Sequence, residues 1–236
     1  MVGLGDDLLI ARDEAPRYVP DGEVEPGELS IGRYGVTGEE LGRIIGVPCV
    51  LRAYWGSGAV SGTVPLRMVY ASAAIDAGDT VYLTNGDEYQ VLALDVDGSA
   101  RFALRVNYVP ESLDEERKRE AARTTIDDFS QFVPDINEDD FAWPDRHQAV
   151  DRLAVDGNGN LYVFPRIFGW LAPYPQPEGP FGVDVYSPEG ERLFSGKMPI
   201  WQWHAARDDR LYSIETDPET EEAVVVRYRF LTDVAR

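Results

Sequence analysis

Cysteine is almost absent from this chain of 236 residues, and that scarcity excludes two kinds of small cross-linked fold. The single thiol, Cys49, can form no intramolecular disulfide, and thiolates alone can build no zinc cluster around it. Cys49 follows Pro48 in the apolar run 47–51, so we expect it to be buried and unreactive. With 44% hydrophobic residues, the chain is long enough to be held together by a packed core instead.

Positive charge is scarce as well. Lysine and arginine together number 22 against 42 aspartates and glutamates, which gives a net charge of −20. Because phosphate backbones are bound by clustered basic surfaces, this acidic protein is expected to have no nucleic-acid partner. Only Lys118 and Lys197 are lysines, and the other 20 basic residues are arginines. A GC-rich genome explains that bias most simply, and selection for arginine chemistry is the alternative.

Long apolar runs are missing, so no segment approaches the roughly 18 residues that a membrane-spanning helix needs. The first residues, Met1-Val-Gly-Leu-Gly-Asp-Asp7, contain neither the basic nor the apolar segment of a signal peptide. The sequence therefore predicts a protein that is soluble as written. It leaves the compartment open, because a leader in an upstream segment would make the protein an exported one.

Recognisable catalytic and metal-binding motifs are missing too. The histidines, His147 and His204, form no H-x-x-x-H pair, and there is no G-x-S-x-G nucleophile motif. Segment 56–62 has its glycines and serines at other spacings and is interpreted as a flexible loop. Segment 156–160 imitates the start of a calcium loop but lacks the later glycine and glutamate, so it predicts a β-turn. We predict no catalytic residue, no metal ligand and no cofactor.

What the sequence does contain is period-two alternation in short runs separated by Gly, Asp, Asn or Pro. These runs fall into four units, at about 1–46, 70–106, 148–196 and 199–232. The last unit has no obvious fourth strand. Four-stranded antiparallel units repeated along a chain are typical of propeller blades. We therefore predict an all-β fold, a single β-propeller domain over residues 1–236 with about four blades.

The longer connections support this division of the chain. In a four-stranded meander, the links 1–2 and 3–4 lie at one end of the strands, and the remaining links lie at the other. The predicted 1–2 and 3–4 turns are all tight, whereas segments 12–28, 46–72, 107–148 and 165–181 are long. Each long segment falls in a 2–3 link or between units. The sequence therefore predicts one loop-rich face.

One long segment, the insertion 107–147, is predicted to contain a helix near 112–133. Ser112 and Glu115 have the spacing of a capping box, and Ile126, Phe129 and Val133 follow at helical spacing until Pro134. The apolar stripe would suit a lid across the mouth of a propeller. A solvated insertion is the alternative.

Residues that could recognise a ligand are aromatic and gather in these long segments. Segment 164–181 is rich in proline and aromatic residues, which stiffen a loop and offer contact area. The same residues could instead pack over the blade core. The candidate ligand-binding residues are Trp55, Trp143, His147, Phe168, Trp170, Tyr174, Trp201 and His204. His204 alternates with tryptophans in an expected inner strand, where a structural hydrogen-bonded role is the alternative to a functional one.

Two stretches carry a family resemblance. Segments 150–163 and 183–193 resemble the strand pairs and hairpins of bacterial six-bladed β-propellers of the TolB-like and NHL-like type. Segments 79–98 and 210–230 look like further blades of that kind. The resemblance implies that this chain corresponds to the C-terminal four blades of such a ring, N-terminally incomplete, and a closed four-bladed ring is the alternative. Gluconolactonase-type relatives hold a divalent metal on tunnel carboxylates, but no such ligands can be matched here.

These features favour a non-catalytic binding module over an enzyme. We expect an unidentified protein, peptide or carbohydrate ligand to bind the loop-rich face, and open blade edges to favour self-association. The alternative function is a metal-assisted hydrolase or lactonase that uses carboxylates at the tunnel. A propeller fold by itself decides neither.

Overall fold

The alternating runs form strands in the computed structural model, and these strands pair into antiparallel sheets. The structure describes residues 2–4, 7–14, 17–18, 24–25, 27–35, 37–49, 53–57, 60–64, 72–76, 78–86, 88–110, 112, 114–129, 138, 146, 148–165, 180–200, 203–207, 210–217 and 219–229. Within these ranges the fold is all-β apart from one helical insertion, and the prediction of repeated four-stranded antiparallel sheets is confirmed.

Four sheets follow one another along the chain. The first sheet contains β1 (Val2–Leu4), β2 (Asp7–Glu14), β5 (Gly27–Gly35) and β6 (Glu40–Cys49). The second contains β9 (Ser72–Ile75), β10 (Val81–Thr84), β11 (Gln90–Leu94) and β12 (Ala100–Arg105). The third contains β13 (Arg152–Val155), β14 (Leu161–Phe164), β15 (Phe181–Tyr186) and β16 (Arg192–Met198). Among the described residues, the fourth has three strands, β17 (Ala205–Arg207), β18 (Arg210–Thr216) and β19 (Ala223–Arg229).

The sheets pack face to face because β10 and β14 are buried at every position. In β10, Val81 and Leu83 pack against the first sheet, whereas Tyr82 points to the third. In β14, Leu161 and Val163 pack on the second sheet, whereas the alternate residues pack on the fourth. Side chains alternate across a strand, so a strand that is buried on both faces needs no polar residue. Three cores thus hold the four sheets together.

The tight turns share one hydrogen-bonding pattern, which explains why they contain Gly, Asp or Ser. In the turn 156–160 the amide of Asp156 donates to the carbonyl of Asn160 at 3.1 Å, and the amide of Gly159 donates back to Asp156 at 3.1 Å. The Asp156 carboxylate also accepts the amides of Asn158 and Asn160. Gly159 has a φ of 80°, a conformation that glycine adopts without strain. The expected β-turn is confirmed, since these carboxylate oxygens serve the turn itself.

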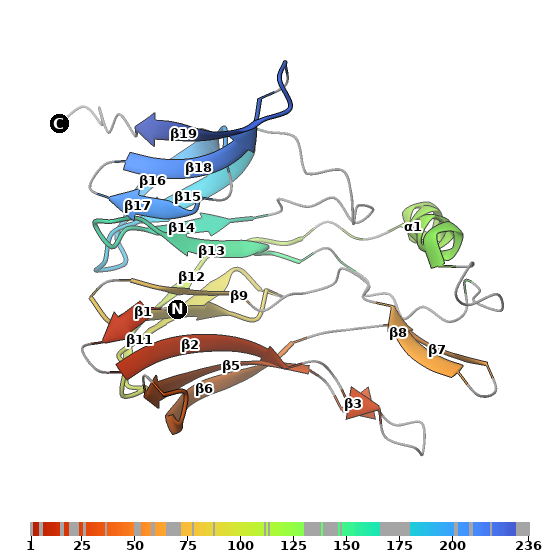
Figure 1. Cartoon of the computed structure of the whole chain (residues 1–236), viewed down its shortest axis with the longest axis horizontal. Helices are drawn as coiled ribbons and strands as arrows, with labels where there is room; N and C mark the ends of the chain where they lie inside the picture. The colour runs from red at the N-terminus through yellow and green to blue at the C-terminus, as the bar shows by residue number, and fades with distance from the viewer. Residues whose placement is uncertain are drawn as a thin grey trace.

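The same bonds recur in the turns 35–39, 76–80, 95–99 and 187–191, at one end of the sheets. Longer connections leave the other end, where two additional hairpins and a helix stand beyond the sheets (Figure 1). The predicted loop-rich face is therefore present. The four sheets lie in a row with the first and the last at opposite ends (Figure 1). This arrangement is propeller-like but does not form a closed ring, and the incomplete six-bladed ring stays a prediction.

Several local predictions were wrong. Segment 56–62, expected to be a flexible loop, belongs to a hairpin of β7 (Ala53–Ser57) and β8 (Val60–Val64). A second hairpin, β3 (Arg17–Tyr18) with β4 (Val24–Glu25), lies within the long connection between β2 and β5, where no strand was predicted. Glycine and serine lower the propensity for strands, so cross-strand pairing rather than local preference forms the hairpin at 53–64.

The helix α1 (Glu115–Phe129) begins at a different residue from the one that the capping box predicts. Asp114 occupies the N-cap position, because its carbonyl accepts the amide of Lys118 at 3.1 Å. Ser112 instead bridges to Arg146 in an isolated antiparallel pair. Figure 1 places α1 beyond the strand ends, so the lid across the mouth stays a prediction, and Val133 and Pro134 lie outside the described residues. Among the residues that the structure describes, no helix is long and apolar enough to cross a membrane.

Candidate functional site

A pocket lies where β10 ends and β11 begins, at the loop-rich end of the second sheet. Its volume is about 150 Å³, and its lining residues are Leu83, Thr84, Asn85, Gln90 and Leu92. Leu83 belongs to the face of β10 that packs toward the first sheet. Gln90 and Leu92 lie on the corresponding face of β11, because Leu92 pairs with Leu83 and residues two apart share a face. The pocket therefore opens beside the junction of the first and second sheets.

Local hydrogen bonds fix the shape of this connection. The amide of Gly86 donates to the Thr84 hydroxyl at 3.1 Å, which turns the chain directly after β10. The carbonyl of Gly86 accepts the amides of Ala149 at 2.7 Å and Val150 at 3.2 Å. These bonds tie the pocket to the start of the third sheet.

The lining of the pocket is neutral. Two leucines supply apolar surface, while a hydroxyl and two amides supply donors and acceptors. Among the described residues, Glu88 and Arg105 form an exposed ion pair at 2.8 Å, and Arg105 is directly opposed to the lining residue Gln90. An exposed pair of this kind contributes little binding energy. The described lining therefore suits a neutral ligand that offers both hydroxyl groups and an apolar face.

The opposite face of β11 is occupied by a buried tyrosine cluster. The Tyr89 hydroxyl donates to Asp184 of β15, and the Tyr89 ring lies edge-on to Tyr108 with centroids 6.1 Å apart. Burial, followed by the hydrogen bond to Asp184, raises the pKa of Tyr89 far above its usual value. Tyr89 therefore stays protonated and acts as a permanent donor. It fastens the second sheet to the third and is not available as an acid or base.

The structure tests few of the aromatic residues that the sequence predicts as ligand-binding. Trp55 lies in β7, where its backbone pairs with Gly62, but its side chain is outside what the structure describes. Six further candidates also lie outside the described residues, namely Trp143, His147, Phe168, Trp170, Tyr174 and Trp201. Their role in binding stays a prediction.

His204 is the one candidate whose side chain is described, and it makes structural contacts. It precedes β17 instead of lying within a strand, so the expected inner strand begins later, at Ala205. Its Nδ1 atom accepts the amide of Ile214 at 3.2 Å, and its own amide donates to Tyr212 at 2.8 Å. The neighbouring Trp203 packs edge-on against Tyr162 with centroids 5.0 Å apart. His204 thus joins the ends of β17 and β18.

The pocket residues themselves were missed by the sequence analysis. The sequence shows only Thr84-Asn85-Gly86 directly after an apolar strand, and this pattern predicts an ordinary turn. Nothing in the sequence distinguishes a turn that lines a cavity from one that faces solvent. Within the described part of the chain, no group of three or more His, Cys, Asp or Glu residues could hold a metal ion.

No family model and no curated protein matches this chain. Among solved structures, it is similar to one described as a luciferin-regenerating enzyme, with 14% identity and a TM-score of 0.32. The match covers 97% of this chain and 63% of that protein, so this chain spans less than two thirds of its length. The resemblance to the TolB-like and NHL-like propellers stays a prediction. The function has to be argued from this chain's own residues.

Proposed function

We propose that the protein is a non-catalytic binding module with a propeller-like fold, and that its loop-rich face takes a neutral carbohydrate ligand. The observation that carries this proposal is the pocket at the end of β10. It combines the leucine surface of Leu83 and Leu92 with the polar groups of Thr84, Asn85 and Gln90. Sugar rings present an apolar face and a rim of hydroxyl groups, and this lining complements both.

The position of the pocket supports the same proposal. Ligand sites are concave, largely pre-formed and equipped with a few well-placed polar groups. The described strands that flank the long segments end at this side of the sheets, and we propose that the aromatic candidates in those segments extend the binding surface. A sugar residue in the pocket would then be one end of a longer glycan.

The test is saturation-transfer NMR with glucose, galactose and N-acetylglucosamine as probes, beside a capped neutral tripeptide. We expect saturation transfer to at least one of the sugars, and its loss in Gln90→Ala and Asn85→Ala, because each variant removes an amide from the pocket. Glu191→Gln, at an exposed position in a tight turn of the third sheet, is the matched control and should bind as the unmodified protein does. Transfer to the tripeptide alone would favour a peptide ligand, and transfer to none of the probes would overturn the proposal.

The alternative predicted from the sequence, a metal-assisted hydrolase or lactonase, has a separate test. Elemental analysis of the purified protein would reveal calcium or zinc in stoichiometric amount if this alternative holds. The same preparation should then hydrolyse a simple lactone, and removal of the metal should abolish that activity. A stoichiometric metal together with lactone hydrolysis would replace the binding-module proposal.

A further inference from the structure

The fourth sheet has one covered face and one exposed face. Leu211 and Ser213 of β18 point to the third sheet and are buried. The alternate residues point outward and form the surface that we call the outer face, comprising Ala205, Arg207, Arg210, Tyr212, Ile214, Thr216, Ala223, Val225, Arg227 and Arg229. Directly opposed residues of an antiparallel pair share a face, so the strand register defines this surface.

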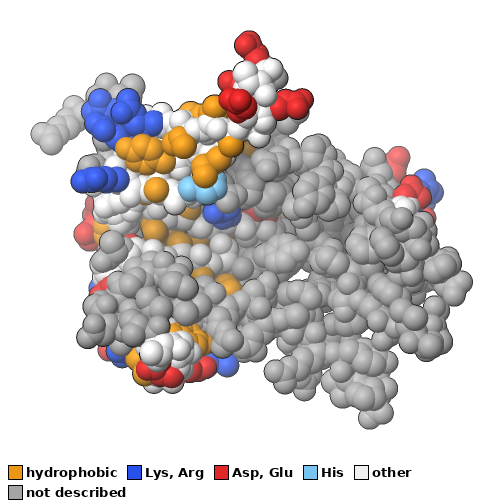
Figure 2. Space-filling model, viewed as in Figure 1, with side chains coloured by type: hydrophobic (Ala, Val, Ile, Leu, Met, Phe, Trp, Pro, Cys, Tyr) orange, Lys and Arg blue, Asp and Glu red, His pale blue; other side chains and the backbone are white. Residues whose placement is uncertain are grey.

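The centre of the outer face is apolar. Ile214 and Val225 are directly opposed on β18 and β19, with 53% and 72% of their surfaces exposed. Among the residues that the structure describes, the other exposed large hydrophobic side chains are Leu41, Val109, Leu193 and Phe194, and no two of these are directly opposed on neighbouring strands. Figure 2 shows hydrophobic side chains over the uppermost sheet. Ile214 and Val225 therefore form a contiguous apolar contact area at the centre of the outer face.

One end of the outer face is basic. Arg207, Arg210 and Arg229 lie in one row across the three strands, and Arg227 is opposed to Tyr212 in the next row. All four arginines are exposed. Four of the 22 basic residues of this acidic protein thus lie together at one end of the fourth sheet.

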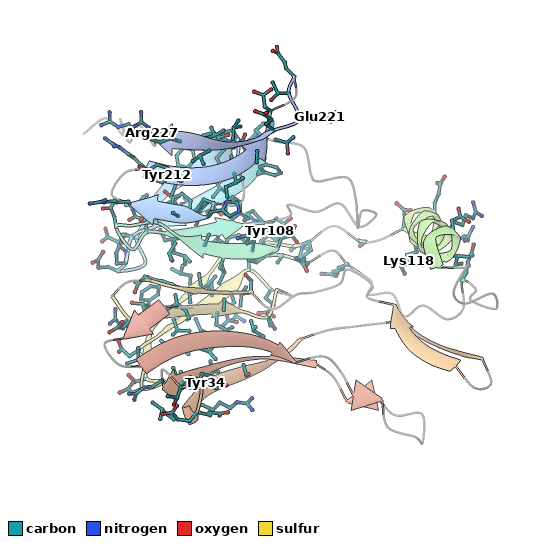
Figure 3. All side chains as sticks on the ribbon, in the orientation of Figure 1. Tyr34, Tyr108, Lys118, Tyr212, Glu221 and Arg227 are labelled. Atoms are coloured by element: carbon teal, nitrogen blue, oxygen red, sulfur yellow. The ribbon has the colours of Figure 1, made fainter. Side chains whose placement is uncertain are left out.

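The other end of the outer face is acidic. The hairpin between β18 and β19 carries Asp217, Glu219, Glu221 and Glu222, of which the three glutamates are exposed. Backbone bonds hold its shape, since the amide of Asp217 donates to Glu222 at 2.9 Å and the amide of Glu221 donates to Asp217 at 2.8 Å. Figure 3 shows Arg227 and Glu221 at opposite ends of the sheet, and the acidic side chains in Figure 2 rise from its plane.

The two charged ends are equally far from the apolar centre. Along β19 and the turn that precedes it, Val225 is four residues from Arg229 and four from Glu221, at most about 13 Å in each direction. Consider a two-fold axis that lies in the plane between two facing copies and runs across the strands at the Ile214–Val225 pair. Rotation about this axis exchanges the two ends of the face, so the basic end of each copy lies on the acidic end of the other. The outer face is therefore complementary to itself.

We propose that the outer face of the fourth sheet binds the same face of a second copy of this chain across a two-fold axis. Such an interface is isologous, the form that most homodimers use. Ile214 and Val225 of both copies pack at the axis, and the arginine rows contact the acidic hairpins on both sides. Charge at such an interface fixes the register and excludes other partners. The proposal does not depend on the pocket, which lies at the junction of the first and second sheets.

The decisive experiment inverts the two ends in separate variants of the full chain and measures mass by sedimentation equilibrium. We expect the unmodified protein to be a dimer. The variant Arg207→Glu/Arg227→Glu/Arg229→Glu has two acidic ends, because only Arg210 stays basic there. The variant Glu219→Lys/Glu221→Lys/Glu222→Lys has two basic ends, because only Asp217 stays acidic there. Each should repel itself and raise the dissociation constant at least about tenfold. An equimolar mixture of the two should form a heterodimer, because their ends are again opposite in sign.

A second variant tests the apolar centre. Val225→Glu sets two carboxylates against each other at the axis and should raise the dissociation constant by at least about a hundredfold. Because Val225 is exposed, circular dichroism should show an unchanged fold. The matched control Lys197→Glu/Glu191→Lys changes exposed charges on the third sheet and should leave the dimer intact. Three results would overturn the proposal. They are a monomeric unmodified protein, inverted variants that still dimerise on their own, and a mixture of the two inverted variants that stays monomeric.

Discussion

The third and fourth sheets contain the same dipeptide in their second strands but bury it differently. Leu161 and Tyr162 of β14 are both buried, at 0% and 3% exposure. In β18, Leu211 is buried at 1%, whereas Tyr212 is only half-buried. The third sheet lies between two neighbours, and the fourth covers only one. The sequence of a strand thus defines its two faces, and the number of neighbouring sheets decides whether one or both faces are buried.

The strongest test of this comparison is removal of one large side chain from each sheet. Phe164 is fully buried between the third and fourth sheets, so Phe164→Ala should lower the free energy of unfolding by about 3–5 kcal/mol. Val225→Ala, on the outer face, should change the unfolding of the monomer by less than about 0.5 kcal/mol. Urea unfolding followed by circular dichroism measures both. Equal losses would show that the two sheets are buried alike.

Turn glycines provide a second test, since the cost of a methyl group depends on what it would meet. Gly190 of the third sheet has a φ of 86°, and a Cβ there would lie 3.1 Å from the Phe102 ring of the second sheet. Gly38 of the first sheet has a φ of 90° and open space around it. Gly190→Ala should lower the free energy of unfolding by about 2 kcal/mol, because it adds both backbone strain and crowding. Gly38→Ala should lower it by about 1 kcal/mol, because it adds backbone strain alone. Thermal unfolding of both variants would separate the two contributions.

Alkaline pH should weaken the contact between the second and third sheets. Burial, followed by the charge of Asp76, raises the pKa of Tyr82 from 10.0 to about 12. Because the pKa is raised in the folded state, the stabilisation is complete below pH 10 and is lost as the pH rises through about 12. Tyr82→Phe removes this titration and keeps the ring that packs on Phe102. Urea midpoints between pH 8 and 12 should fall less steeply in the variant, and an equal fall would contradict this assignment.

The smallest expected effect concerns a turn that lacks the glycine of its counterparts. Asp79 has a φ of 68°, at the place where the turns of the first and third sheets have glycines with positive φ. Asp79→Gly relieves backbone strain but makes the unfolded chain more flexible, so a gain of about 0.5 kcal/mol is expected. Differential scanning calorimetry would detect it. A fall in melting temperature would indicate that the Asp79 side chain stabilises the turn.

Much of the fold could be predicted from the sequence because the relevant interactions are local. Alternation located most strands of the four sheets, although β1 was not predicted and β17 begins later than expected. The Asp or Ser that begins most of the tight turns accepts amides of its own turn. The two extra hairpins were not predicted, because glycines and serines interrupt the alternation at 56–62 and because β3 and β4 are only two residues long each. The extension of β6 through Pro48 was missed for a similar reason. In the sheet order β6 is an edge strand, where the missing amide of a proline costs little.

The candidate site was hardly predictable at all. The aromatic residues that composition singles out lie almost entirely outside the described residues, and His204 makes structural contacts. The pocket depends on Leu83 and Gln90, which come from different strands and meet only when β10 and β11 pair. A sequence without a catalytic motif contains no signal for such a meeting.

The sequence by itself determined the strands, their two faces and the turns that join them, because side-chain alternation and backbone conformation act over a few residues. Only the tertiary structure decided which faces became cores and which stayed exposed. Val224, Val225 and Val226 show this most clearly, since they form one apolar run in the sequence. In the sheet, Val225 points outward and the residues beside it point to the third sheet. The difference arises because burial depends on the presence of a neighbouring sheet, and residue type alone does not specify one.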